Sequence, residues 1–93
     1  MFGGSVSIHE LKTWPEYFSA VMNGTKTFEF RSSFDLDFQV GDTLYLREWD
    51  QKTKEYSGRI LYADVPYIFR VFADHMILSL VNVRSYFSEQ ISR

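Results

Sequence analysis

The spacing of hydrophobic and polar positions changes once along the chain, and this change predicts an early helix followed by strands. Residues 5–12 alternate apolar and polar side chains, which is typical of a short strand. Apolar residues then recur at helical spacing over residues 14–22, which favours an amphipathic helix. Beyond residue 25 the alternation returns and continues, with interruptions, to residue 83.

The predicted helix has clear signals at both ends. Thr13 is the expected N-cap, and Glu16 would complete a Thr-x-x-Glu capping box with it. Pro15 falls in the first turn, where its missing N–H costs nothing. Gly24 suits the left-handed position that follows a helix. We therefore expect a helix over Trp14–Asn23.

The rest of the chain predicts strands joined by polar turns. A charged segment from Asp50 to Tyr56 is typical of a hairpin loop. Pro66 cannot donate a ladder hydrogen bond, so a bulge or an edge is expected there, within a strand whose odd positions are apolar. The expected strands after the helix are residues 25–31, 43–49, 58–71 and 76–83.

One helix followed by about four strands predicts a small α+β barrel, with the helix plugging one end. The chain has 93 residues and a mass of 11.0 kDa, which is room for a single domain. We assign residues 1–93 to that domain, with a core over residues 5–83 and a tail over residues 84–93.

Composition narrows the classes of function. Aromatic residues make up 18% of the chain, so large rings fill much of a small core. The absence of cysteine excludes disulfide scaffolds, thiolate zinc sites and thiol nucleophiles. A net charge of -2 argues against a histone-like grip on duplex nucleic acid, but it leaves room for a local basic groove.

The first residues and the apolar runs indicate a cytoplasmic protein that does not enter a membrane. Residues 1–4 lack the basic start and the apolar stretch of a signal peptide. Apolar runs extend over only a few residues, so none is expected to span a membrane.

Residues 24–31 carry the most informative group of charges. Glu29 and Arg31 are two apart, so on a strand they share a face and can form an ion pair or hold a polar ligand. Lys26 has the opposite parity and joins them only if it lies in the turn after Gly24. The alternative is a solvated strand of alternating charge.

A second group of candidates lies on the expected strand 43–49. Tyr45, Arg47 and Trp49 share one face, an arrangement that can stack bases and contact phosphate. The alternative is a cross-strand packing ladder with a cation–π contact. Lys12, at the end of the first strand, could reach the same cleft as Lys26 or remain a surface charge.

No cofactor and no metal site are expected. Asp35 and Asp37 make a metal site conceivable, but a polar loop is the preferred interpretation. His9 and His75 are far apart in the sequence and are interpreted as ordinary strand or loop residues. Asp42, after a glycine, is expected to fix a turn through the backbone.

The pattern G-x-K-x-x-E-x-R, formed by Gly24, Lys26, Glu29 and Arg31, resembles the ASCH domain. The resemblance covers Ile8 to Val83 and extends to a small group of bacterial and phage ASCH-type proteins without an assigned function. It implies a PUA-like mixed β-barrel with a cleft beside the first helix, and RNA binding, which is the role proposed for ASCH domains. The other blocks that carry it are HELK at 9–12, WPEYF at 14–18, KTFE at 26–29, FQVGD at 38–42 and LRE at 46–48.

Some relatives that this resemblance brings in are enzymes. Small bacterial ASCH proteins that resemble amidohydrolases of acetylated cytidine use a lysine, a threonine three residues later, and a more distant glutamate. Lys26 matches the lysine, but Glu29 stands where the threonine would be. The insertion that carries the later glutamate has no counterpart at residues 72–75. Relatives with a metal-dependent ribonuclease activity offer no better match, because this chain has no compact His/Asp cluster.

The preferred function is binding of RNA, another single-stranded nucleic acid or a nucleotide. No membrane role is expected, and the sequence does not predict an oligomeric state. Glu29 would accept hydrogen bonds from a base edge or orient a neighbour. The alternative is a small hydrolase acting on a modified nucleoside or on RNA, with Lys26 as the polarising or basic group and Glu29 as the general acid/base. A protein-interaction role is a third option. The nucleic-acid-binding candidates are Lys12, Lys26, Glu29, Arg31, Arg47 and Trp49.

Overall fold

A computed structural model of the chain describes residues 6–32 and 37–85. Over this part, one helix is inserted among seven strands. The elements in chain order are β1 (Ile8–Thr13), α1 (Pro15–Met22), β2 (Phe28–Ser32), β3 (Thr43–Asp50), β4 (Glu55–Asp64), β5 (Ile68–Phe72), β6 (His75–Ser79) and β7 (Val81–Ser85).

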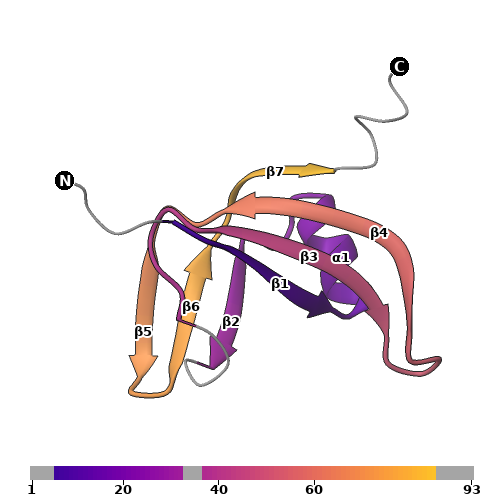
Figure 1. The fold of residues 1–93 in the computed structure, drawn as a ribbon, viewed down its shortest axis with the longest axis horizontal. Helices are drawn as coiled ribbons and strands as arrows, with labels where there is room; N and C mark the ends of the chain where they lie inside the picture. Colours follow the sequence, from indigo (N-terminus) through magenta and orange to yellow (C-terminus); the bar gives the residue numbers. More distant parts are fainter. Residues whose placement is uncertain (1–5, 33–36, 86–93) are drawn as a thin grey trace.

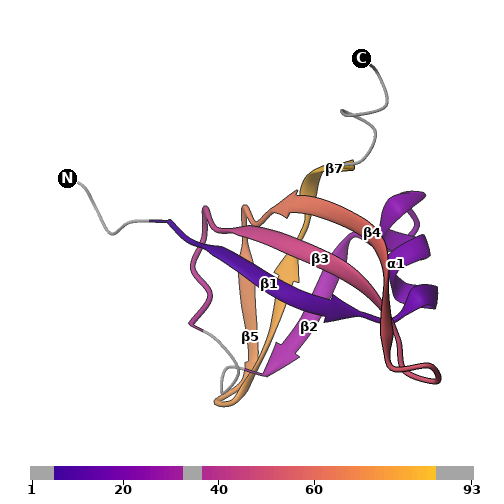
Figure 2. The same cartoon turned by 45° about the vertical axis from the view of Figure 1, so that its right-hand side comes forward.

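The strands form two sheets (Figures 1 and 2). The first sheet has the order β1-β3-β4-β7, and the second has the order β2-β6-β5. β1 runs parallel to β3, and the other paired strands are antiparallel. The chain passes from the first sheet to the second between β1 and β2 by way of α1, which lies beside β3.

The inner faces of both sheets and the buried side of α1 form one hydrophobic core. Alternation along β3 and β4 turns every second side chain inward, as the apolar pattern predicted for this part of the chain. The inner residues of β6 and two helix residues close the same cluster. Its members are Leu11, Phe18, Val21, Phe38, Leu44, Leu46, Leu61, Ala63, Val65, Met76, Leu78 and Leu80.

The helix lies within one residue of its predicted bounds, but its first turn is not capped as expected. Trp14 occupies the N-cap position without a side-chain cap hydrogen bond. Thr13 is instead the last residue of β1, where it points inward in phase with Leu11. At the other end Gly24 has φ +87°, which confirms its predicted left-handed role. The capping box was wrong because strand alternation had already fixed the direction of Thr13.

The prediction of a PUA-like mixed β-barrel with a helix plugging one end was wrong. Among the residues described, no hydrogen-bond ladder joins the two sheets, so β1 and β7 remain edges of the first sheet and β2 and β5 edges of the second. The helix packs on β3 instead of closing a barrel mouth. An apolar alternation shows which face of a strand is buried, but it carries no information on which edges pair, and this is why the sequence did not exclude an open arrangement.

Two predicted strands are each divided between the sheets. The expected strand over residues 58–71 breaks around Pro66 into β4 and β5, at the place where a bulge or an edge was predicted. The expected strand over residues 76–83 breaks at Leu80 into β6 and β7. Each corner lets a single apolar segment contribute to both layers of the core.

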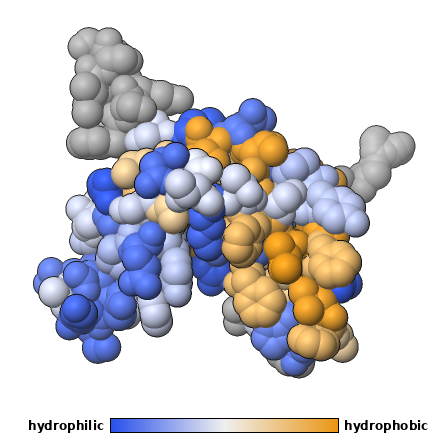
Figure 3. Space-filling view, turned by 180° about the vertical axis from the view of Figure 1, so that it is seen from behind, coloured by the Kyte–Doolittle hydropathy of each residue, from blue (hydrophilic) through white to orange (hydrophobic). Residues whose placement is uncertain are grey.

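The outer face of the second sheet is unusually apolar. Figure 3 shows this as the hydrophobic surface that lies over β2, β6 and β5. Register places Phe30, Ile77 and Phe69 side by side across the three strands. Phe30 and Phe69 are both more than half exposed. The odd positions are apolar on both sides of Pro66, but beyond it Tyr67 and Phe69 face outward.

Candidate functional site

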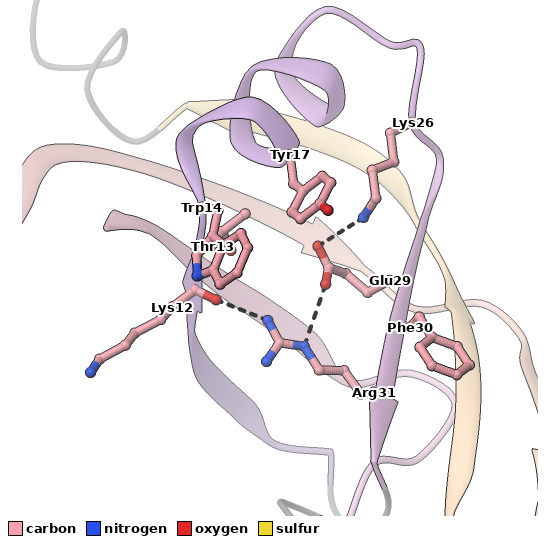
Figure 4. Close-up of a pocket in the computed structure, with 8 residues that line it drawn as sticks. All are labelled: Lys12, Thr13, Trp14, Tyr17, Lys26, Glu29, Phe30 and Arg31. Atoms are coloured by element: carbon pink, nitrogen blue, oxygen red, sulfur yellow. Dashed lines mark hydrogen bonds and ion pairs between the residues drawn. The ribbon is translucent and has the colours of Figure 1, made fainter. Parts of the chain in front are cut away.

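A pocket of about 410 Å³ opens between the start of α1, the end of β1 and β2 (Figure 4). It lies where the sequence predicted a cleft beside the first helix. Its size falls within the range of about 300–1,000 Å³ that is usual for small-molecule sites. The residues that line it are Lys12, Thr13, Trp14, Tyr17, Lys26, Glu29, Phe30 and Arg31.

Glu29 forms the polar centre of this pocket, between two cationic side chains. Lys26 Nζ lies 3.4 Å from Glu29 Oε2, and Arg31 Nε lies 3.4 Å from Glu29 Oε1. Figure 4 shows the two cations on opposite sides of the carboxylate. Their side chains are 19% and 22% exposed, so both remain accessible from the pocket. Two positive groups facing one negative group leave the pocket electropositive.

The turn after α1 explains how Lys26 reaches Glu29 in spite of its opposite strand parity. The backbone N–H groups of Thr25 and Lys26 both donate to the carbonyl of Ala20, at 3.0 and 2.9 Å. This holds Lys26 in the helix-terminal turn, two residues before β2 begins at Phe28. The condition under which the sequence allowed the three charges to meet is therefore fulfilled.

The carboxylate of Glu29 is buried but only loosely hydrogen-bonded. The residue is 5% exposed, and its two charged partners each stand at 3.4 Å, whereas close charge-assisted bonds measure about 2.7–2.9 Å. The shortest bond of Lys26 Nζ, at 2.8 Å, goes to the carbonyl of Phe28. A carboxylate has about four acceptor positions, so Glu29 keeps capacity for further donors.

Aromatic rings form the apolar wall of the pocket. Trp14 and Tyr17 are nearly parallel, at 13°, with ring centroids 6.0 Å apart. Both are close to half exposed, so the pair contributes accessible aromatic surface to the pocket wall. Lys26 Nζ lies 5.5 Å from the centroid of the Tyr17 ring and 5.0 Å from that of Phe28. These rings hold the ammonium group at the pocket edge.

Lys12 contributes its main chain to the pocket instead of its charge. Arg31 Nη2 donates to the carbonyl of Lys12 at 2.9 Å, which ties β2 to the end of β1. The Lys12 side chain points away from Glu29 (Figure 4), and its Nζ lies 4.3 Å from the centroid of the Trp49 ring. Of the two possibilities left open for Lys12, its ammonium group has the orientation of a surface charge, because the alternation of β1 turns the side chain outward.

Arg47 and Trp49 lie outside the pocket, on the outer face of the first sheet. Arg47 Nη1 bonds Glu10 Oε2 at 2.9 Å, and its guanidinium lies 3.7 Å from the centroid of the Tyr56 ring. The hydrogen bond and the charge of Glu10 raise the pKa of Arg47. Tyr45 packs on its cross-strand neighbour Tyr62, with ring centroids 5.1 Å apart. The cross-strand packing ladder considered for these residues is thus present in the fold.

The sequence did not single out Thr13 as a pocket residue, although it had a role for it elsewhere. Thr13 is one of the residues that line the pocket, and its buried hydroxyl oxygen has no hydrogen-bond partner in the structure. The two-residue spacing from Leu11 was the available signal, since it places both on the inner face of β1. Tyr17 and Phe30 were also missed, because they looked like ordinary members of apolar stripes.

Asp42 is a second buried carboxylate, and its contacts are those of a structural group. It accepts hydrogen bonds from the Ser7 N–H at 2.9 Å and the Gln39 N–H at 2.8 Å, and it contacts His9 Nε2 at 2.7 Å. Burial would raise the pKa of Asp42, but these bonds outweigh it and lower the pKa below its usual value. Asp42 thus fixes the turn as predicted, and His9 serves the same junction.

Within residues 6–32 and 37–85 no three His, Asp or Glu side chains gather as a metal site. Asp35 lies outside the described residues, so the pair with Asp37 has no structural account. Over the same ranges the single helix is too short and too polar to cross a membrane.

Comparison with known proteins finds a phage relative. The chain is 41% identical over 58 residues to a protein of Escherichia phage P2 called "Uncharacterized 12.9 kDa protein in GpA 3'region". The aligned segment is 62% of this chain and 50% of the relative, so the chain spans about half the length of the curated relative that it matches. Neither this match nor the family match names an ASCH domain. The family model described as "Domain of unknown function (DUF3850)" matches residues 8–80, and the chain belongs to this family.

Proposed function

We propose that this protein binds RNA or another single-stranded nucleic acid through one base held in the Glu29 pocket. The observation that carries the proposal is the meeting of Lys26, Glu29 and Arg31 beneath the Trp14 and Tyr17 rings. Aromatic faces stack bases, cations contact phosphate or base acceptors, and a carboxylate accepts from base N–H groups. These are the three kinds of contact by which proteins bind single strands.

The outer face of the first sheet would bind the flanking part of the strand. Lys12 links the two surfaces, because its carbonyl lies at the pocket wall while its ammonium lies over Trp49. Arg47 is the register neighbour of Lys12 and would contact the next phosphate. The resemblance of residues 24–31 to ASCH domains also supports RNA as the ligand. We place this binding in the cytoplasm, where RNA and nucleotides are present.

A salt titration tests the proposal. RNA oligonucleotides are titrated into the protein at a low and a physiological ionic strength, with fluorescence anisotropy as the readout. Because the protein is acidic overall, binding depends on a few local cations and should weaken with salt, by a logarithmic slope of about -0.7 for each phosphate contacted. No binding at low salt would contradict the proposal.

The matched variants are Lys26→Ala and Lys52→Ala. Lys26→Ala removes a pocket cation and should weaken binding about tenfold. Lys52 is exposed in the hairpin between β3 and β4 and does not line the Glu29 pocket, so its substitution should leave affinity unchanged. Equal affinities of both variants and the unmodified protein would count against the pocket.

A small hydrolase acting on a modified nucleoside is the second candidate. Lys26 Nζ and a Glu29 oxygen, which this activity requires, lie 3.4 Å apart inside the pocket. Incubation with acetylated cytidine and with RNA, followed by mass spectrometry, separates a binder from an enzyme. Turnover that is lost in Glu29→Gln would favour the hydrolase.

A further inference from the structure

We infer that the Glu29 pocket selects guanine, an inference that rests on the proposed function and specifies which base the pocket holds. The first observation is that Glu29, the buried polar centre of the pocket, has unused hydrogen-bonding capacity. Its carboxylate has only its two partners at 3.4 Å. A buried carboxylate is normally satisfied by close donors, so Glu29 indicates a site completed by a ligand.

The order of donors and acceptors along the pocket determines which hydrogen-bonding groups a ligand must offer. Lys26 contacts one carboxylate oxygen of Glu29 and Arg31 contacts the other. A ligand that approaches the carboxylate therefore meets two adjacent acceptors with a cationic donor at each side. It must offer two adjacent N–H donors, with an acceptor next to them.

The Watson–Crick edge of guanine matches this order. Its N1–H and 2-amino groups are adjacent donors that can each reach one oxygen of Glu29, and its O6 is an acceptor beside them for a flanking cation. Uracil offers a single N–H between two acceptors. Cytosine and adenine offer an amino group next to an acceptor nitrogen, which would face an oxygen of Glu29 and be repelled by it.

The remaining walls fit a purine. Trp14 and Tyr17 are nearly parallel aromatic rings at the pocket wall, and a two-ring base has more area than a pyrimidine for stacking on such a wall. The pocket volume of about 410 Å³ accommodates a purine base.

The test uses fluorescein-labelled uridine pentanucleotides whose central base is guanine, hypoxanthine, adenine, cytosine or uracil, titrated into the unmodified protein at low salt. Guanine should bind about tenfold or more tightly than each of the others. Hypoxanthine is the sharpest comparison, since it lacks only the 2-amino group. This comparison needs no altered protein.

Glu29→Gln is the matching variant, because the amide offers one acceptor and one donor in place of two acceptors. The preference for guanine of about tenfold should be lost in this variant. Glu16 is an exposed helix residue outside the pocket lining, so Glu16→Gln should keep the preference. Circular dichroism confirms that each variant is folded, and if Glu29→Gln does not fold, the guanine–hypoxanthine ratio decides.

The outcomes separate the two proposals. Pentanucleotides that bind equally well whatever their central base, or a guanine preference that survives in folded Glu29→Gln, overturn the guanine inference and leave RNA binding intact. Failure of every pentanucleotide to bind overturns both. A preference for guanine over hypoxanthine that is lost in Glu29→Gln supports both.

Discussion

Glu29 and Asp42 are two buried carboxylates with opposite kinds of surroundings. Asp42 has three close partners between 2.7 and 2.9 Å, two of which are backbone N–H groups. Glu29 has two side-chain partners at 3.4 Å and lines a pocket. The hydrogen bonds of Asp42 stabilise the fold and occupy its carboxylate. The carboxylate of Glu29 remains available to a ligand.

Asp42→Asn should destabilise the protein by about 2 kcal/mol. An amide cannot accept from the Ser7 and Gln39 N–H groups with both of its terminal atoms, because one of them is itself a donor. Urea unfolding at neutral pH measures the loss. The control is Asp37→Asn at an exposed position, which should stay within about 0.5 kcal/mol of the unmodified protein.

The stability difference between the unmodified protein and Asp42→Asn should depend on pH. The pKa of folded Asp42 lies below its ordinary value of 3.8, so the stabilisation it gives is present above that pH and is lost as the pH falls through the lowered pKa. The stability difference between the unmodified protein and Asp42→Asn should therefore shrink at acidic pH. A difference that stays constant from neutral pH down to the acid transition would contradict this assignment.

Residue spacing predicted the charged pocket centre well and its other members poorly. Glu29 and Arg31 share a face by strand parity, and the glycine signal at position 24 correctly placed the turn that brings Lys26 to them. Thr13 had two competing patterns, a helix cap and an inward strand position, and the strand prevailed. The outward direction of Lys12 follows from the same alternation.

At the scale of elements, a half-exposed ion pair between β3 and β4 lies against α1. Arg59 donates from Nε and Nη2 to the two oxygens of Glu48, at 2.8 and 3.0 Å, and Ser57 Oγ donates to Glu48 at 2.6 Å. The Arg59 guanidinium also lies 5.0 Å from the centroid of the Phe18 ring. The Arg59 hydrogen bond lowers the pKa of Glu48 against the effect of burial.

Arg59→Lys should lower the melting temperature by several degrees. An ammonium group cannot reproduce the two parallel bonds of the guanidinium fork. Because the Arg59 side chain is 46% exposed, solvent screening limits the expected loss to about 1 kcal/mol. Thermal unfolding followed by circular dichroism measures it. Arg70→Lys, at an exposed position on β5, is the matched control and should show no shift.

Gly24→Ala tests the turn that carries Lys26. A Cβ at this position would meet nothing within 4 Å, so the cost comes from φ +87° alone and should be about 1 kcal/mol. Asparagine tolerates this conformation better, and Gly24→Asn should recover part of the loss. Denaturant unfolding of the two variants gives the comparison, and an alanine variant as stable as the unmodified protein would exclude the strain.

Element types were largely readable from the sequence, but their ends and breaks were not. The helix and the strands β1 to β3 follow directly from apolar periodicity. Pro66 predicted a break in the strand over residues 58–71, but it did not show that the chain passes to the other sheet there. Nothing comparable marks the break at Leu80, since a buried leucine fits a continuous strand and a corner equally well.

At the scale of the whole molecule, the two faces of the second sheet should respond differently to substitution. Leu78→Ala on the inner face should cost about 2–5 kcal/mol, because Leu78 is fully buried in the core. Phe69→Ala on the outer face should cost less than about 1 kcal/mol, because Phe69 is 55% exposed. Chemical denaturation measures both. Equal losses would show that the outer face is covered in solution.

The barrel prediction was wrong because a barrel closes only when the edge strands of the sheets pair with each other. The spacing of apolar residues gives little information on that pairing. The spacing assigned Leu44, Leu46 and Leu61 to a buried face correctly. Assembly of two open sheets uses the same buried faces as a closed barrel. Only the hydrogen-bond register separates the two, and register arises from contacts between distant segments.

The bond from Arg31 to the carbonyl of Lys12 has a consequence for how relatives of this protein are compared. Every amino acid carries a carbonyl, so the anchor persists whatever side chain occupies position 12, provided that β1 keeps its register with β3. A mutational scan of stability would score this position as tolerant, and a chain with a different residue there could keep the same pocket shape. Among relatives, the residue at position 12 should therefore vary, whereas the arginine at position 31 should be retained.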